Sequence, residues 1–528
     1  MTMAQQGQRR MGAQPMFIMS EDASRTSGRD AQSSNITAGK AVAESVRTTL
    51  GPRGMDKMLV SDAGDVVITN DGATILGEMD IEHPAAQMIV EVAETQEEEI
   101  GDGTTTAAVL AGQLLAQAEE LVEDDIHPTT IVEGYHEAAR IAEETVDDQV
   151  LDEELDDELL RTVAASSMTG KGTGDVGAET LAEHVVEAVQ YVADGGASRD
   201  DVRVYTRTGS STSATEVIEG VVLEEEPVIE EMPRNVEDAS IAVLDVELDV
   251  REAEIDAEYS VDSIDQLNAA VEAEEEELRG YAEALADAGI DVVFATDSID
   301  DRVGSFLTKE GILAFEDLGD DDAKAIAGTS GASRLGSVQD IESDDLGQAD
   351  RIRVERFGDD DLVFVEGGAD AESVTLFVRG GTDHVIDELE RGINDAVDVV
   401  VAALEAGGVV PGAGSTEIAI SDRVRDEASG ISGRKQLAVE AFADAVDALP
   451  RTLAANAGID PIDALVDLRA TFDAEGRAGI VTEGDGGNVG DPVEAGILDP
   501  AAVKREAVRS ATESATMIVR IDDVISAE

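Results

Sequence analysis

The stretch Gly101–Thr106 (GDGTTT) combines residue types that suit phosphate binding. Its two glycines let a ligand approach the main chain closely, and its three threonines fall at the predicted start of a helix, where unpaired N–H groups bind anions. Asp102 would repel a phosphate unless a cation such as Mg²⁺ lay between them. Because Asp and Thr are also good helix N-caps, the spacing alone leaves a Mg²⁺–phosphate site and a simple helix cap as open alternatives.

Other stretches that resemble nucleotide or metal motifs are incomplete. Met168–Lys171 ends like a Walker phosphate loop, but Ala165 stands where that motif needs a glycine. Gly412-Ala413-Gly414 is followed by Glu417 at the place of the third glycine of a dinucleotide fingerprint. The five histidines are scattered and the chain has no cysteine, which excludes disulfides and thiolate metal sites and argues against a histidine metal site.

Helices and a turn are predicted to position the Gly101–Thr106 loop. One helix begins at Pro84 and ends before Gly101, and a longer helix follows the threonines and ends near His127. Upstream, the β-branched run Val66–Thr69 predicts a strand that closes in the turn Asn70-Asp71-Gly72.

The remaining chain changes in texture along its length. The first 35 residues lack periodicity and are predicted to be frayed. Helical patterns dominate near both ends, and a stretch rich in β-branched residues lies between them, so we predict a multidomain protein of α plus α/β class. The predicted segments are a helix over 38–50, a largely helical region over 130–200, strands over 202–245 and 352–380, an acidic helical block over 263–289, and helices over 385–406 and 415–475.

The charge of the chain is strongly negative along its whole length. Lys plus Arg number 37 and Asp plus Glu number 117 among 528 residues, which gives a formal net charge of −80. Such a composition is typical of proteins from extreme halophiles, because at 1 M salt the Debye length is about 3 Å and neighbouring carboxylates scarcely repel each other. An acidic partner for a basic protein usually concentrates its charge in blocks, so the even spread favours adaptation to salt.

The same composition excludes several classes of protein. A surface this negative repels phosphate backbones and anionic lipids, so we expect no nucleic-acid partner and no membrane partner. No stretch approaches the roughly 20 apolar residues of a membrane span. Residues 1–14 are polar and lack the apolar core of a signal peptide, so the expected location is the cytoplasm.

Several motifs together resemble one family. Leu50–Lys57 (LGPRGMDK), Thr69–Leu76 (TNDGATIL) and Gly101–Thr106 resemble the ATP-site signatures of chaperonins. Met79–Ala86 (MDIEHPAA) is similar to the archaeal and eukaryotic group II branch, the thermosomes. The resemblance covers nearly the whole chain, since it resumes at Arg379–Thr382 (RGGT), Val409–Glu417 (VVPGAGSTE), Asn456–Gly458 (NAG) and Arg520–Asp523 (RIDD).

The resemblance implies a chaperonin fold. Such a subunit has a mainly helical equatorial ATPase domain made from both chain ends, a split intermediate domain, and a mixed α/β apical domain with a helical lid protrusion. The implied ranges are 1–147 and 404–528 for the equatorial domain, 148–215 and 368–403 for the intermediate domain, and 216–367 for the apical domain, with the protrusion near 246–285.

The resemblance also implies a set of site residues. Asp102 would hold Mg²⁺, Asp395 would be the catalytic carboxylate on the intermediate domain, and Lys171 would approach the γ-phosphate. A carboxylate suits hydrolysis because it can orient the attacking water or take its proton. The implied ATP-binding residues are Leu50, Gly51, Pro52, Asn70, Asp71, Gly72, Gly101, Asp102, Gly103, Thr104, Thr105, Thr106, Lys171, Gly412, Ala413, Gly414 and Asp499, the last of which would bond the ribose.

The chain departs from the family pattern at Ser61. Many thermosomes carry there a second acid near the attacking water, and in this chain the nearest acid is Asp62. Asp62 is therefore a secondary candidate for a catalytic role, with a shifted geometry.

The predicted function is that of an ATP-dependent chaperone subunit of a halophilic archaeon. The resemblance implies stacked rings of eight or nine subunits, formed with itself and with sister subunits, that enclose unfolded or partly folded proteins. The implied cofactors are ATP and Mg²⁺, with K⁺ as a further candidate. The alternatives are an ATP-dependent small-molecule phosphotransferase of a halophile and a structural ring subunit that binds ATP weakly. The joint presence of Asp102, Asp395 and Lys171 argues against the last.

Overall fold

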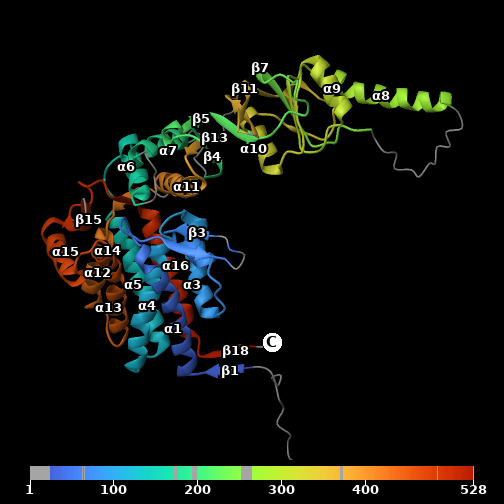
Figure 1. Cartoon of the computed structure of the whole chain (residues 1–528). Helices are drawn as coiled ribbons and strands as arrows, with labels where there is room; N and C mark the ends of the chain where they lie inside the picture. Colours follow the sequence, from blue (N-terminus) through green and yellow to red (C-terminus); the bar gives the residue numbers. More distant parts are fainter. Residues whose placement is uncertain are drawn as a thin grey trace, which may run out of the picture.

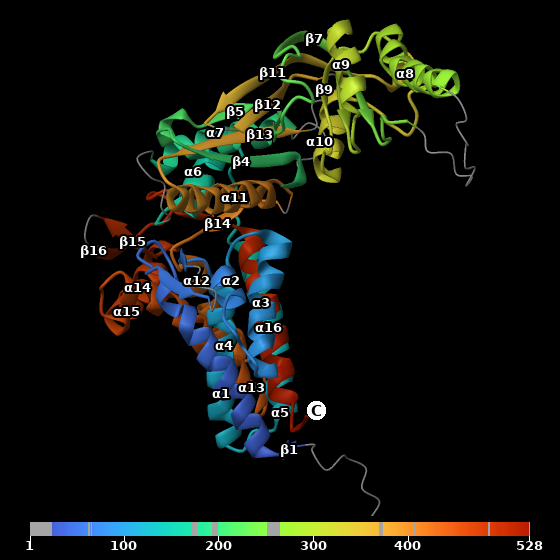
Figure 2. The same cartoon turned by 45° about the vertical axis from the view of Figure 1, so that its right-hand side comes forward.

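The computed structural model divides into three bodies (Figure 1). The chain passes through the first and second bodies into the third and then returns through the second to the first. We call them the helical body, the middle body and the distal body. In both views the middle body lies between the other two (Figures 1 and 2). The structure describes residues 24–61, 64, 66–170, 177–192, 199–250, 264–339, 341–358, 360–368, 373–405, 407–483 and 486–526.

The helical body contains both ends of the described chain. Strand β1 (Ser24–Ser27) pairs antiparallel with β18 (Asp523–Ser526) at its far end, away from the middle body (Figure 2). Its helices are α1 (Arg29–Val46), η1 (Arg47–Thr49), α2 (Gly72–Gly77), α3 (Pro84–Ile100), α4 (Thr104–Glu123), α5 (Pro128–Asp148), α12 (Ser415–Ala428), α13 (Lys435–Val446), α14 (Ala448–Asn456), α15 (Pro461–Glu475) and α16 (Ala501–Arg520). Its short strands are β2 (Lys57–Val60), β3 (Val66–Thr69), β14 (Val409–Pro411), β15 (Gly479–Glu483), β16 (Gly486–Gly490) and β17 (Leu498–Pro500).

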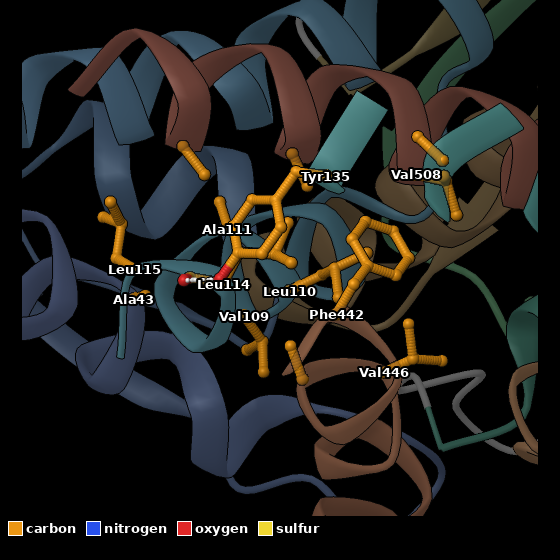
Figure 3. Packing of buried hydrophobic residues seen from close by; sticks show 14 of the residues in the cluster. Ala43, Val109, Leu110, Ala111, Leu114, Leu115, Tyr135, Phe442, Val446 and Val508 are labelled. Atoms are coloured by element: carbon orange, nitrogen blue, oxygen red, sulfur yellow. Dashed lines mark hydrogen bonds between the residues drawn. The ribbon is translucent and has the colours of Figure 1, made fainter. Parts of the chain in front are cut away.

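The core of the helical body forms around α4, which is apolar on nearly every side. Tyr135 of α5 and Phe442 of α13 are fully buried, and their rings meet edge to face with centroids 5.9 Å apart (Figure 3). The Tyr135 hydroxyl donates a hydrogen bond of 2.8 Å to the main-chain oxygen of Leu114. Helices from both halves of the sequence therefore share one core, which fixes the two halves relative to each other.

Two of the sequence predictions near the loop are confirmed, and one is wrong. Helix α3 spans Pro84–Ile100 and ends at Gly101, whose φ of 76° gives the left-handed cap expected of glycine. Val66–Thr69 forms β3 of a hairpin with β2. The prediction that residues 1–35 are frayed is wrong for residues 24–35, because β1 covers Ser24–Ser27 and α1 begins at Arg29 and buries Ala31 and Ile36. Residues 1–23 lie outside the described residues.

The middle body contains elements from two separate parts of the chain, 157–218 and 374–405. Its sheet has the order β4-β13-β5, in which β13 pairs parallel with β4 and antiparallel with β5. Its elements are α6 (Asp157–Met168), α7 (Ala178–Val192), η3 (Arg199–Asp201), β4 (Val202–Thr208), η4 (Thr212–Ala214), β5 (Glu216–Ile218), β13 (Val374–Gly380) and α11 (Asp383–Glu405). Helix α11 continues from this sheet toward the helical body (Figure 1).

The distal body is a mixed sheet covered by helices. Within the described residues its strands follow the order β6-β12-β11-β7-β8-β9, with β10 also paired to β7, and the parallel strands β8 and β9 are buried throughout. Its elements are β6 (Gly220–Glu224), β7 (Asn235–Leu244), α8 (Ile264–Asp287), β8 (Val292–Ala295), α9 (Asp301–Glu310), β9 (Leu313–Phe315), α10 (Asp320–Ser330), β10 (Arg334–Leu335), η5 (Ser343–Asp345), β11 (Gly347–Phe357) and β12 (Asp360–Glu366).

Helix α8 projects outward from the distal body (Figures 1 and 2). It confirms the predicted acidic helical block, while residues 251–263 of the same excursion lie outside the described residues. Among the described helices, none has both the length and the apolar composition that crossing a membrane requires.

The shared core predicts a large cost for removing its aromatic pair. Phe442→Ala should lower the free energy of unfolding by about 3–5 kcal/mol, because it deletes a fully buried ring and leaves a cavity. Urea unfolding in molar KCl, followed by circular dichroism, measures the change. Phe442→Leu is the matched control and should cost less, since it keeps most of the apolar volume. Equal midpoints for wild type and Phe442→Ala would contradict the packing described.

Candidate functional site

One pocket gathers most of the residues that the sequence analysis singled out. It lies where the helical body meets the end of α6 from the middle body, and it is lined by both halves of the chain. The predicted residues in its wall are Leu50, Gly51, Pro52, Asn70, Asp71, Asp102, Gly103, Thr104, Thr105, Thr106, Ala413, Gly414 and Asp499.

The turn after β3 and the start of α4 form one connected wall. Asp71 caps α2 by accepting a hydrogen bond of 2.6 Å from the Thr74 amide, and its other carboxylate oxygen accepts one of 3.0 Å from the Thr104 hydroxyl. A Cβ on Gly72 would lie 2.6 Å from the Thr105 hydroxyl oxygen, so only glycine allows this approach. The turn and the threonines are therefore positioned together.

The loop between α3 and α4 is held from behind by Gln96. Its side-chain amide donates a hydrogen bond of 2.7 Å to the main-chain oxygen of Asp102. Gly103 has a φ of 84°, and a Cβ there would lie 2.7 Å from Val503 of α16. With this main chain fixed, the first turn of α4 presents its N–H groups toward the pocket, which suits an anionic ligand.

The opposite end of the pocket is apolar and is bounded by a strained turn. Ala413 has a φ of 55°, which is uncommon for a residue other than glycine, and its carbonyl accepts a hydrogen bond of 2.9 Å from the Ile480 amide. Apolar side chains of this wall are Leu449, Leu453, Ala457, Ile480 and Ile497. A ligand with a flat apolar part and an anionic part would match the two ends.

Lys504 is a pocket residue that the sequence analysis missed. Its ammonium contacts Glu417 Oε1 at 2.7 Å and Asp499 Oδ2 at 2.8 Å, and all three side chains line the pocket. Burial lowers the pKa of Lys504, but the two carboxylates outweigh it and hold the pKa above its ordinary value. The sequence could have pointed to Lys504 through the scarcity of lysine, since the chain has seven lysines in 528 residues.

Helix α11 brings the charge of Asp395 near the side of the pocket that Asp71 and Asp102 line. Asp398, one turn later, lies so close to Gly101 that a Cβ there would collide with its side chain. Burial of the Glu97 carboxyl group raises its pKa to about 8. The negative charges of Asp71, Asp395, Asp398 and Asp102 raise it further, and their effects decrease in that order. Asp395 does not line the pocket itself, but its charge acts on the same place as Asp71 and Asp102.

The end of α6 closes the pocket from the middle body. Ser166, Ser167 and Thr169 line it, and a Cβ on Gly170 would lie 2.7 Å from the Pro52 carbonyl oxygen. Lys171, the next residue, lies outside the described residues, as does Asp62.

Three predicted glycines lie behind the pocket surface and do not line it. Gly72 and Gly101 allow close approach by Thr105 and Asp398, respectively, while a Cβ on Gly412 would lie 3.0 Å from Asp499 Oδ2. Their contribution is to shape the walls.

The residues present fit a magnesium ion that is shared with phosphate. Mg²⁺ is usually bound by one or two carboxylates together with phosphate and water oxygens, and Asp102 lies at the phosphate-binding end of the pocket. Within the described ranges, no group of three or more acidic or histidine side chains is arranged to hold a metal alone.

Comparison with known proteins decides the family. The profile of the TCP-1/cpn60 chaperonin family matches residues 42–528. The chain belongs to this family. Thermosome subunit 3 of Haloferax volcanii is 69% identical to this chaperonin over 98% of the chain and 99% of its own length. Thermosome subunit alpha of Halobacterium salinarum is 53% identical over 99% of the chain and 93% of its own length. Thermosome subunit beta of Methanothermobacter thermautotrophicus is 46% identical, over 98% and 95%.

The family resemblance stated from the motifs is therefore confirmed, and the helical and mixed α/β content of the structure agrees with it. The phosphotransferase alternative finds no support among these relatives. Haloarchaeal relatives also support the assignment of the acidic composition to a halophilic archaeon.

The buried Lys504 predicts a strong effect on this chaperonin. Lys504→Met should destabilise the subunit by about 3–5 kcal/mol, because the buried Glu417 carboxylate and the part-buried Asp499 carboxylate would lose the cation that they share. The double variant Lys504→Met/Glu417→Gln should recover part of the loss, since one of the two charges is then gone. Thermal unfolding in molar KCl measures both. If the single variant unfolds at the wild-type temperature, the buried ion pairs are not structural.

Proposed function

We propose that this chain is an ATP-driven subunit of a group II chaperonin, which encloses unfolded or partly folded proteins and releases them after a cycle of lid closure. The observation that carries the proposal is the joint placement of Asp102 and the threonines of α4 at one end of a pocket and Asp395 on a helix from another body. Membership of the TCP-1/cpn60 family and the thermosome relatives support it.

The three bodies correspond in this proposal to the equatorial, intermediate and apical domains. The boundaries proposed from the motifs, 147/148, 215/216, 367/368 and 403/404, fall between the elements of the three bodies or at their edges. Three elements depart from these boundaries. Helices α5 and α11 reach Asp148 and Glu405, one and two residues beyond a boundary, and β5 (Glu216–Ile218), which pairs with β13 of the middle body, lies wholly beyond 215/216. Helix α8, which projects from the distal body, would belong to the lid protrusion.

The pocket suggests how ATP lies in it. The apolar end near Leu453 and Ile480 would take the adenine, and Asp499, held by Lys504, would take the ribose. The N–H groups and hydroxyls of Thr104, Thr105 and Thr106 would hold the phosphates. When bound through Asp102, Mg²⁺ would supply charge neutralisation at the phosphates.

Asp395 has the position and chemistry to act on the attacking water. Its carboxylate would orient the water in line with the γ-phosphate, or accept its proton. Because Asp395 belongs to α11 of the middle body, it reaches the phosphate end only while α11 lies against Gly101. Hydrolysis would thus depend on closure of the middle body over the nucleotide.

The first prediction from this proposal concerns Asp395→Ala. We expect it to bind ATP with wild-type affinity but to hydrolyse it roughly 100-fold more slowly or worse, because the water loses its orienting group. Phosphate release and a nucleotide-binding assay measure the two quantities. Asp387→Ala is the matched control, since Asp387 is an exposed acid on the same helix. Equal turnover by wild type and Asp395→Ala would remove Asp395 from the mechanism.

Self-association is supported by apolar side chains exposed on the β2–β3 hairpin and the segment before it. A monomer gains nothing from exposing such a group, and a contiguous apolar patch of this kind is typical of a protein–protein interface. The exposed residues are Met55, Met58, Val60, Val66 and Ile68. We propose that this hairpin contributes to contacts between subunits in stacked rings of eight or nine.

The second prediction concerns assembly and salt. In molar KCl with Mg-ATP, sixteen or eighteen copies of the 55.2-kDa chain should give a particle near or a little below 1 MDa. Dialysis to about 0.1 M salt lengthens the Debye length to about 10 Å, so carboxylate repulsion should dissociate the particle and then unfold it. Light scattering measures the mass at each step. A monomer in molar KCl would contradict the ring, and a particle stable at low salt would contradict the adaptation to salt.

A further inference from the structure

Arg199 is joined to the helix that carries Asp395, although it lies almost 200 residues earlier in the chain. Its guanidinium donates a hydrogen bond of 2.8 Å to Asn394 Oδ1 and forms an ion pair of 2.7 Å, through Nε, with Asp398 Oδ1. Asn394 and Asp398 are four residues apart, so they lie on one face of α11. Arg199 thus grips the helix immediately before Asp395 and one turn after it.

The third nitrogen of the Arg199 guanidinium, Nη1, binds the main chain of the middle body. Arg199 Nη1 donates a hydrogen bond of 2.9 Å to the main-chain oxygen of Val202, the first residue of β4. The planar guanidinium suits this task because it presents several N–H donors in fixed directions. The short η3 segment is thereby tied to α11 and to the middle sheet at once.

Asp398 carries the effect of this grip to the pocket. Its side chain is only 18% exposed and lies against Gly101, the first residue of the phosphate-binding loop. Around this contact lie the acidic side chains of Asp71, Asp102, Asp395 and Glu97, since the charges of Asp398 and of the other three aspartates all act on Glu97. Without a cation beside Asp398, these acids would push α11 away from the loop.

We infer that Arg199 is a positioning residue for hydrolysis, which holds α11 against Gly101 and so keeps Asp395 at the phosphate end of the pocket. The inference rests on the proposed role of Asp395. It concerns where the helix lies, because Arg199 itself is not part of the pocket wall.

The structure also links the same segment to the distal body. Strand β4 begins three residues after Arg199 and carries Arg203 and Arg207. These two residues are four positions apart, so they lie on the same face of the strand. Arg203 pairs with Asp322 of α10 at 2.6 Å, and Arg207 pairs with Glu224 of β6 at 3.2 Å. Movement of the distal body would therefore act on β4, and through Arg199 on the helix that carries Asp395.

The decisive experiment compares Arg199→Ala with wild type in the assembled particle, in molar KCl. We expect kcat for ATP hydrolysis to fall about 10- to 100-fold while the Kd for ATP stays within about twofold, because a small misplacement of a catalytic group has effects of this size. Arg199→Lys should show an intermediate kcat, since an ammonium keeps the charge but cannot make the three directed contacts.

A second variant separates positioning from general damage. If repulsion displaces α11, removing the Asp398 charge should relieve it, so Arg199→Ala/Asp398→Asn should turn over faster than the product of the two single effects predicts. Arg161→Ala is the matched control, because Arg161 of α6 forms a more distant pair, 3.8 Å, with Asp157 in the same body. It should leave kcat unchanged.

Hydrogen exchange at α11 gives a readout that does not depend on turnover. Arg199→Ala should exchange faster over residues 390–400 than wild type. Unchanged exchange would overturn the grip, and faster exchange with unchanged kcat would overturn the positioning role. If Asp395→Ala retains wild-type turnover, the proposed role of Asp395 fails instead, and faster exchange in Arg199→Ala would then show only that Arg199 holds the helix.

Discussion

The contact between Asp398 and Gly101 is the constraint on which the arrangement of the site depends. Helix α11 can lie against the loop between α3 and α4 only because residue 101 has no side chain. The same glycine ends α3 in a left-handed conformation, which turns the chain so that α4 begins at the pocket. One residue therefore sets both the local direction of the loop and the distance between two bodies.

The negative charge of the chain shapes how its few cations are used. Lys504 is enclosed by Glu417 and Asp499, Arg425 and Arg469 both contact the buried Asp447, and Arg199 lies beside Asp398. Each of these cations lies beside a buried or part-buried carboxylate and offsets the cost of burying its charge. Because the chain has 37 basic and 117 acidic residues, most of its carboxylates cannot each have a cation of their own. Salt must therefore screen the repulsion between them.

The placement of the pocket connects nucleotide binding to the rest of the fold. Its walls come from helices of both chain halves and from the end of α6, so the pocket is complete only when the middle body lies against the helical body. The core around Tyr135 and Phe442 holds the two chain halves in fixed positions relative to each other. Because both halves line the pocket, this core also fixes the pocket walls. Motion is thus expected between bodies and not within the helical body.

The sequence by itself determined the elements around the loop and the residue types of the pocket. Proline at the start of α3 and glycine at its end act through local backbone preferences, which require no distant partner. The family motifs carried the remaining site residues, including Asp395, Asp499 and Gly414.

Only the tertiary structure decided which distant side chains meet. Lys504 looks like a surface residue of an amphipathic helix until Glu417 and Asp499 are placed around it, and Arg199 stands in a segment without any motif. The start of α1 at Arg29 was missed for the same reason, since its apolar face is defined by the α4 side chains that cover it. The contact of Lys504 with Glu417 joins residues 87 positions apart, and that of Arg199 with Asn394 joins residues 195 positions apart, so short-range patterning in the sequence holds no information about them.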